Sequence, residues 1–156
     1  MKYKLGDKHE EFELYRIIAI RSLEGVSVGS IGGWIESEKN LSQNGDAWVS
    51  GDAWVFGNAW VSGNARVSGD ARVSGDAWVF GNARVSGNAR VSGNLSIDYT
   101  PINIIGLEYS ITIFKKSEQI QAGCFLKTIA EWETITSFED QKFLDEWKDK
   151  ILALAK

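Results

Sequence analysis

Residues 45–98 read GDAWVS GDAWVF GNAWVS GNARVS GDARVS GDAWVF GNARVS GNARVS GNLSID, one six-residue unit after another. The unit G-[D/N]-A-[W/R]-V-[S/F] occurs eight times before it decays after Gly93. A fixed short period is typical of repeat architectures, in which each unit packs only on its neighbours. This stretch therefore predicts a solenoid, around which the rest of the 156-residue chain is arranged.

Each letter of the unit has a structural cause. Alanine and valine stand two positions apart, so in a strand both point to one side while the Trp or Arg between them points to the other. Glycine supplies the unusual backbone angles of a turn, and the Asp or Asn after it can hydrogen-bond the corner backbone. Counting back from Ala47 in steps of six reaches Leu41 and Ile35, both aliphatic, so we expect the first coil to begin near Trp34.

The spacing of valine and alanine resembles the hexapeptide-repeat family of left-handed parallel β-helices, in which a small residue follows an aliphatic residue four positions later. Val49 with Ala53, and Val55 with Ala59, satisfy this pattern. The chain departs from many members by placing Ser or Phe, and not Gly, directly after the aliphatic residue. The resemblance implies about three to four triangular coils of 18 residues each; a flattened coil of 12 residues is the alternative.

The outward residues are the ones that coil geometry does not explain. With 18 residues per coil they stack in the columns Trp48-Arg66-Arg84, Trp54-Arg72-Arg90 and Trp60-Trp78-Ser96. Tryptophan layered on arginine predicts cation–π contacts of about 0.5–1 kcal/mol each, and exposed aromatic area usually marks a contact surface. Burial under the terminal modules or a second subunit is the alternative. The predicted binding residues are Trp48, Trp54, Trp60, Trp78, Phe56, Phe80, Arg66, Arg72, Arg84 and Arg90.

The segment before the repeat predicts a small β module. Residues Tyr3–Leu5 and Phe12–Arg21 are rich in strand formers and are separated by a turn-like stretch, so we expect a hairpin. Glycines between Gly25 and Gly33 indicate a loop or bend. We therefore predict an N-terminal β cap over residues 1–33 and the β-helix over residues 34–100.

The segment after the repeat, residues 101–156, predicts a C-terminal α+β cap that ends in an amphipathic helix. An exit loop over residues 95–105 leads into a hairpin of strands Leu107–Phe114 and Gln119–Phe125. The spacing of Thr128 and Glu131 indicates a helix start, as do residues 137–140. The apolar face of the last helix is predicted to be Phe143, Leu144, Trp147, Ile151 and Leu154. The predicted fold is thus mainly β: a short parallel β-helix with caps that hide its strand edges.

Several motifs also resemble a group of uncharacterised proteins of bacteriophages and prophages. They are Leu14–Ile17, Gly32–Glu38, Asn40–Ser42 and the Gly-[Asp/Asn]-Ala repeats, and they span about the first 95 residues. Residues 123–124 and 128–132 are similar to a tail of that group. The resemblance implies a phage accessory setting, and it supplies no established activity and no catalytic residues.

No set of residues favours catalysis, a cofactor or a metal site. The single histidine, His9, lies in a predicted turn, away from the coil faces, so the general base of hexapeptide acyltransferases has no obvious counterpart. Cys124 falls on the apolar face of a predicted strand, which favours a buried structural thiol. Turn chemistry explains the four aspartates that raise calcium as an alternative, which are Asp46, Asp52, Asp70 and Asp76.

The charge and hydropathy pattern narrows the class of partner and the location. The 17 basic and 21 acidic residues are spread along the chain, which argues against binding of a long nucleic acid. No stretch has the length and apolar character of a signal peptide or a membrane span, so we expect no membrane association. The expected location is the cytoplasm, that of the host cell if the chain is phage-encoded, with the virion as the alternative.

These observations predict a non-enzymatic accessory binding protein of phage type, without cofactor or metal. The expected partner is a host protein or a small anionic nucleotide bound through the aromatic and arginine faces, with inhibition of a host defence as the resulting role. A structural virion component and a hexapeptide acyltransferase are the alternatives. We also expect solenoid faces to pack into a homo-oligomer, a trimer or a dimer.

Overall fold

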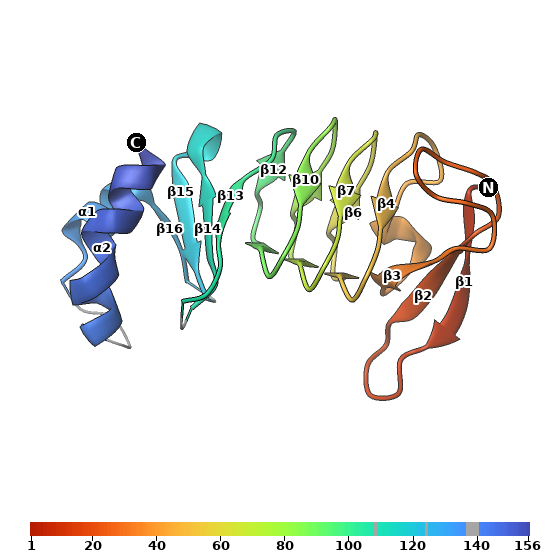
Figure 1. The fold of residues 1–156 in the computed structure, drawn as a ribbon, viewed down its shortest axis with the longest axis horizontal. Helices are drawn as coiled ribbons and strands as arrows, with labels where there is room; N and C mark the ends of the chain where they lie inside the picture. Colours follow the sequence, from red (N-terminus) through yellow and green to blue (C-terminus); the bar gives the residue numbers. More distant parts are fainter. Residues whose placement is uncertain (108, 124, 137–140) are drawn as a thin grey trace. The chain divides into compact units, whose positions relative to one another are not determined.

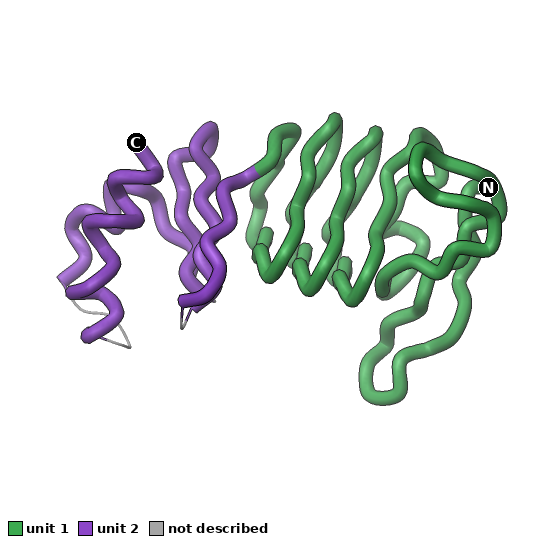
Figure 2. The backbone as a smooth tube through the Cα atoms, in the orientation of Figure 1, with its two compact units in different colours: residues 1–100 green, residues 101–156 purple. Residues whose placement is uncertain are grey.

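The computed structural model describes residues 1–107, 109–123, 125–136 and 141–156. The chain divides into two compact units, Met1–Thr100 and Pro101–Lys156, shown in green and purple in Figure 2. The predictions for Cys124 and for the helix start at residues 137–140 lie outside the described residues.

Unit 1 is built around a solenoid of two-residue strands (Figure 1). Each strand is the Trp-Val or Arg-Val pair of one repeat, or Ser-Ile in the last, and the Gly-Asp or Gly-Asn pair lies in the turn between strands. The strands are β4 (Trp48–Val49), β5 (Trp54–Val55), β6 (Trp60–Val61), β7 (Arg66–Val67), β8 (Arg72–Val73), β9 (Trp78–Val79), β10 (Arg84–Val85), β11 (Arg90–Val91) and β12 (Ser96–Ile97).

Parallel strands stack one coil on the next with a spacing of 18 residues, as in the pairs Trp48–Arg66 and Arg66–Arg84. The three faces of the coil are the strand series β4-β7-β10, β5-β8-β11 and β6-β9-β12. The predicted triangular coil is therefore confirmed. The 12-residue coil is wrong, because Trp48 pairs with Arg66 and not with Trp60.

Alanine and valine fill the interior of the solenoid. The repeat alanines and valines from Ala47 to Val91 are all 0% exposed, and Ile97 continues the series in the last coil. A small side chain alternating with a branched one fits the narrow space between three faces, and each buried valine contributes about 1.5–3 kcal/mol to stability. The predicted inward set is confirmed.

The corner glycines adopt a left-handed backbone and lie against one another. Gly69 has a φ of +68°, and a Cβ there would lie 3.0 Å from the backbone N and O atoms of Gly87 in the next coil. Gly25, in the N-terminal segment, has a similar φ of +72° but no atom within 4 Å of a Cβ. The coils therefore require glycine at Gly69 for two reasons, the dihedral angle and the close approach.

We predict that Gly69→Ala lowers the free energy of unfolding by about 1–3 kcal/mol more than Gly25→Ala does. Both variants carry the conformational cost of a left-handed alanine, so their difference reports the contact between coils. Urea unfolding followed by circular dichroism measures it. Equal losses of stability in the two variants would contradict the prediction.

The N-terminal segment forms a hairpin whose sheet continues into the solenoid. Strand β1 (Tyr3–Lys8) pairs antiparallel with β2 (Tyr15–Ala19), which pairs antiparallel with β3 (Ile31–Ile35). Strand β3 then pairs in parallel with β5. The hairpin agrees with the sequence, although its second strand is shorter than predicted and the predicted glycine loop ends earlier, at Ile31. Because β3 belongs to both parts, the hairpin and the solenoid share one sheet.

The first coil is two residues longer than the later ones. Ile35 pairs with Val55, and Leu41 bridges to Val61, so both partners lie 20 positions apart. The 3-10 turn Glu38–Asn40 takes up the extra length, and Asn40 Nδ2 donates to two carbonyls of the next coil at 3.0 and 2.9 Å. A shift of two residues keeps the same side chains inward, so Ile35 and Leu41 are buried as predicted.

Two buried polar side chains fasten the N-terminus to the first coil. Lys2 Nζ donates to the carbonyl of Ala47 at 2.6 Å, and burial, followed by the charge of Arg21, lowers the pKa of Lys2 to about 8. The Tyr3 hydroxyl donates to the carbonyl of Leu41 at 2.8 Å, and burial raises its pKa. Both groups tolerate burial because each has a hydrogen-bond partner.

The described residues of unit 2 form an antiparallel sheet and the helices α1 and α2. The strands lie in the order β13 (Ile102–Ile104), β14 (Ile111–Phe114), β15 (Gln119–Ala122) and β16 (Phe125–Thr128), with a 3-10 turn at Lys115–Ser117. The predicted hairpin corresponds to β14 and β15. The predicted second strand divides in two, because Gly123, with a φ of +57°, lets β16 fold back on β15. The predicted exit loop over residues 95–105 instead contributes β12 and β13.

Helix α1 (Ile129–Thr134) begins with the predicted capping box. The Glu131 N–H donates to Thr128 Oγ1 at 3.1 Å, and the Thr128 N–H donates to the Glu131 carboxylate at 2.7 Å. These bonds lower the pKa of Glu131, since they favour its charged form. Trp132 is buried beneath the helix and donates from Nε1 to the carbonyl of Ile120 at 3.1 Å.

Helix α2 (Gln141–Ala155) packs an apolar stripe into the core of unit 2. The predicted residues Phe143, Leu144 and Ile151 are buried and Trp147 is partly buried. The prediction is wrong for Leu154, which is 49% exposed, because the stripe follows Leu144, Ile151 and Ala155 and leaves Leu154 at its edge. That this unit covers the open end of the solenoid stays a prediction.

Candidate functional site

The outward side chains of the solenoid form the three predicted columns, one on each face. The register pairs Trp48 with Arg66 and Arg84, Trp54 with Arg72 and Arg90, and Trp60 with Trp78 and Ser96. The surroundings of the columns differ, because the N-terminal segment lies against only part of the solenoid. The columns therefore differ in what they offer a ligand.

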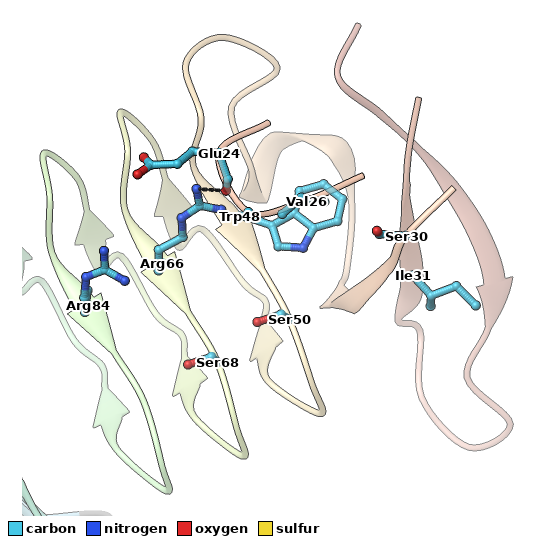
Figure 3. Close-up of a pocket in the computed structure, with 10 residues that line it drawn as sticks. Glu24, Val26, Ser30, Ile31, Trp48, Ser50, Arg66, Ser68 and Arg84 are labelled. Carbon is cyan, nitrogen blue, oxygen red and sulfur yellow. Dashed lines mark hydrogen bonds between the residues drawn. The ribbon is translucent and has the colours of Figure 1, made fainter. Parts of the chain in front are cut away.

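The first column lines an open hollow of about 510 Å³, here called the arginine hollow (Figure 3). Arg66 and Arg84 come from neighbouring strands, and Ser50 and Ser68 lie just beyond two strands of the same face. The hollow is lined by Glu24, Gly25, Val26, Ser30, Ile31, Trp48, Ser50, Arg66, Ser68 and Arg84. It thus combines guanidinium groups, hydroxyls and apolar side chains.

The two arginines of this hollow differ in their partners. The Nη2 of Arg66 donates to the backbone carbonyl of Glu24 at 2.5 Å, which fixes that guanidinium. Within the described part of the chain, the exposed side chain of Arg84 has no hydrogen-bond or ion-pair partner. The lining includes one carboxylate, that of Glu24, so two positive charges and one negative charge leave a net charge of +1.

Trp48 is not the exposed side chain that the sequence predicted. It is only 3% exposed, and it lines the arginine hollow together with the segment from Glu24 to Ile31. Sequence reasoning missed Glu24, Ser30 and Ile31 as lining residues. No sequence signal could have found them, because the six-residue period stops before this segment and only tertiary folding brings it to the coil.

The second column shows the predicted stacking of arginine on tryptophan. The guanidinium carbon of Arg72 lies 4.6 Å from the ring centroid of Trp54, and that of Arg16 lies 4.1 Å from Trp34. Arg16 also donates to Asp52 at 2.8 Å, which ties β2 to a corner of the solenoid. The cation–π prediction is therefore confirmed at Trp54.

His9 lies on this face, contrary to the prediction that it has no place there. Its ring centroid is 4.9 Å from that of Trp34 and 5.5 Å from that of Trp54, in edge-on contacts. The hairpin loop carries it there, which the sequence gave no means to foresee. The backbone N–H of Glu11 donates to His9 Nδ1 at 3.2 Å. The surroundings of His9 are thus mainly aromatic.

The third column carries an exposed aromatic cluster, here called the aromatic face, which consists of Trp60, Trp78 and Phe80. The rings of Trp60 and Trp78 stack with centroids 5.1 Å apart and an interplanar angle of 18°, and Phe80 lies 4.7 Å from Trp78. Trp60 is 41% exposed and Trp78 39% exposed. Trp78 Nε1 donates to Ser62 Oγ at 3.1 Å, which holds the stack in place.

The corner aspartates bond to neighbouring side chains. Asp46 lies 3.8 Å from Arg21, and Asp76 accepts from Asn58 at 3.0 Å across two coils. Across residues 1–107, 109–123, 125–136 and 141–156, no three His, Cys, Asp or Glu side chains are grouped as metal ligands. None of the helices in these same ranges is long and apolar enough to cross a membrane.

Comparison with known proteins agrees with the repeat and goes no further. A family model described as the YdcK beta solenoid repeat matches residues 65–81 and 83–96. This chain is a β-solenoid repeat protein. No curated protein matches its sequence. The matched residues include Arg66, Arg72, Trp78, Phe80, Arg84 and Arg90, so the outward positions of the repeat lie within the matched region.

The stacked pair Trp54–Arg72 predicts a measurable coupling energy. In a double-mutant cycle of Trp54→Leu and Arg72→Met, we expect the two losses of unfolding free energy to be non-additive by about 0.5–1 kcal/mol. The matched control combines Trp54→Leu with Arg84→Met, which lies on another face and is expected to be additive. Additivity in both cycles, measured by urea unfolding, would show that the ring contact contributes nothing.

Proposed function

We propose that this solenoid is a non-enzymatic binding protein and that its arginine hollow takes a small anionic ligand. The observation that carries the proposal is the exposed guanidinium of Arg84, which has no partner within the described chain and lies next to the fixed guanidinium of Arg66. Two guanidinium groups from adjacent strands suit the several acceptor oxygens of a phosphate or carboxylate.

The size and polarity of the hollow support a small ligand over a long polyanion. Its volume of about 510 Å³ falls within the range of small-molecule sites. Ser50 and Ser68 supply hydroxyl donors close to the arginines. The net charge of the lining is only +1, and the chain as a whole carries a net charge of −4, so a long nucleic acid is disfavoured.

The apolar part of the lining favours a ligand with a flat organic group beside its charge. Val26, Ile31 and Trp48 line the hollow that also holds the arginines, and Ile31 is 69% exposed. A nucleotide has this combination, an anionic phosphate joined to a planar base. A mononucleotide is therefore the ligand class that we propose.

The biological setting of the proposal comes from the resemblance of the first 95 residues or so to phage and prophage proteins. In that setting, a protein that sequesters a nucleotide in the host cytoplasm would act as an inhibitor of a host defence. A virion component remains the alternative that the phage resemblance allows. The acyltransferase alternative has less support, because the neighbours of His9 are aromatic rings and not a carboxylate orienter.

We predict that Arg84→Gln weakens binding of adenosine 5′-monophosphate by about five- to tenfold, because a charge-assisted hydrogen bond is lost. Isothermal titration calorimetry at low salt measures the dissociation constant, and raising the salt concentration should weaken binding. The matched control is Arg72→Gln, an arginine at the same repeat position on a neighbouring face, which should bind like the unmodified chain. Equal binding of uncharged adenosine, or an unchanged Arg84→Gln variant, would contradict an anion site.

The aromatic face supports a second function, self-association of the solenoid. Trp60 and Trp78 present two stacked indole rings that are each about two-fifths exposed, and no charged side chain belongs to this column. Large exposed aromatic groups of this kind usually mark a contact surface. A second copy of the chain presents the same surface, and a pair of copies related by a two-fold axis would cover both.

If copies associate through the aromatic face, Trp60→Ser combined with Trp78→Ser should convert an oligomer into a monomer. Multi-angle light scattering over a range of protein concentrations measures the mass. Arg72→Gln serves as the surface control and should leave the mass unchanged. A monomer for the unmodified chain at all concentrations would exclude self-association through this surface.

A further inference from the structure

A second hollow lies on the solenoid face that carries β5, and its chemistry is opposite to that of the arginine hollow. It has a volume of about 270 Å³ and is lined by Phe12, Glu13, Leu14, Glu36, Trp54 and Phe56. Three of these residues come from the loop between β1 and β2, and the others lie at or beside β3 and β5. We call it the aromatic-acidic hollow. It involves neither arginine of the first hollow.

The aromatic lining is held in a defined geometry. Phe12 lies 4.9 Å from Trp54 between ring centroids, with the planes tilted by 60°, and His9 contacts both rings from the side. Phe12 is 46% exposed, and Phe56 is only partly buried. An exposed phenylalanine held at an angle to a tryptophan leaves aromatic surface facing the hollow.

The acidic lining supplies a charge that the solenoid does not fully balance. Glu13 Oε1 accepts from Lys8 Nζ at 2.7 Å, so that carboxylate has a cation beside it. Glu36 Oε2 accepts from the backbone N–H of Gly57 at 2.7 Å, which fixes the carboxylate, and no described residue forms an ion pair with it. Glu36 is therefore a positioned negative charge at the edge of an aromatic hollow.

Aromatic rings with a nearby carboxylate match one ligand chemistry, an organic cation. The faces of Trp and Phe attract ammonium groups, and alkyl substituents on the nitrogen spread the charge and pack against the rings. Arg72 already stacks on Trp54, with 4.6 Å between its guanidinium carbon and the ring centroid, so this ring accepts a cation in the folded chain. A ligand would meet the remaining surface of Trp54 together with Phe12 and Phe56.

We propose that the aromatic-acidic hollow binds a small alkylammonium cation, with Phe12, Trp54 and Phe56 around the alkyl groups and Glu36 balancing the charge. The site is separate from the proposed nucleotide site and does not rest on it. Its small volume suits a compact quaternary ammonium group more than a long polyamine.

The test compares choline with 3,3-dimethylbutan-1-ol, its uncharged isostere, on the full chain at constant ionic strength. Binding is followed by the shift of the Trp54 indole N–H resonance, which is assigned from the spectrum of Trp54→Phe. We expect choline to shift this resonance with millimolar affinity and the isostere to bind at least about fivefold more weakly. Equal binding of the two probes, or no shift with choline, overturns the proposal.

Two variants place the site. Glu36→Gln keeps an acceptor oxygen for the Gly57 N–H but removes the charge, and we expect choline to bind about fivefold more weakly. Phe12→Ala removes an exposed ring, so the fold should survive while choline binding is lost. The control Phe80→Ala lies on another face and should bind choline like the unmodified chain, as should Arg84→Gln. Unchanged binding in Glu36→Gln and Phe12→Ala overturns the proposal, whatever the outcome for nucleotide binding.

Discussion

Backbone hydrogen bonds between residues 18 positions apart hold each coil of the solenoid on the next, as in the bonds of 2.9 Å from Arg66 to Ala83 and from Arg72 to Ala89. These bonds fix the distance between coils at the spacing of neighbouring strands, about 4.8 Å. At that spacing the interior has room only for alanine and valine, and the corners have room only for glycine. The six-residue unit is the direct expression of this constraint.

Because the stacking uses only the backbone, the outward position is free to vary. Trp and Arg occupy it in turn without disturbing the coil, as the pairing of Trp54 with Arg72 and of Trp60 with Trp78 illustrates. A stacked column also brings like residues within reach of one another along one face. The solenoid thus converts a choice at one repeat position into a column of defined chemistry.

The N-terminal segment then gives each face a different character. Residues from Glu24 to Ile31 line a hollow with Trp48 and the arginines, and the loop carrying Phe12 and Glu13 lines another with Trp54. The first is rich in cations and hydroxyls, and the second in rings and carboxylates. The column of Trp60 and Trp78 keeps its exposed rings. Repeats that are nearly identical in sequence therefore present three different surfaces.

The sequence by itself determined the solenoid, its 18-residue register, its inward Ala and Val, and the three outward columns, because each follows from a local period and from steric limits within one coil. It also predicted the capping box at Thr128, which depends on neighbours three residues apart. Only the tertiary structure decided that Trp48 is covered, that His9 meets Trp34, and which segments line the two hollows. Those contacts join residues 20 or more positions apart outside the repeat, as in the bond from Arg66 to Glu24, where no period ties one position to the other. The solenoid is therefore legible in the sequence, and its binding surfaces depend on how the irregular N-terminal segment folds against it.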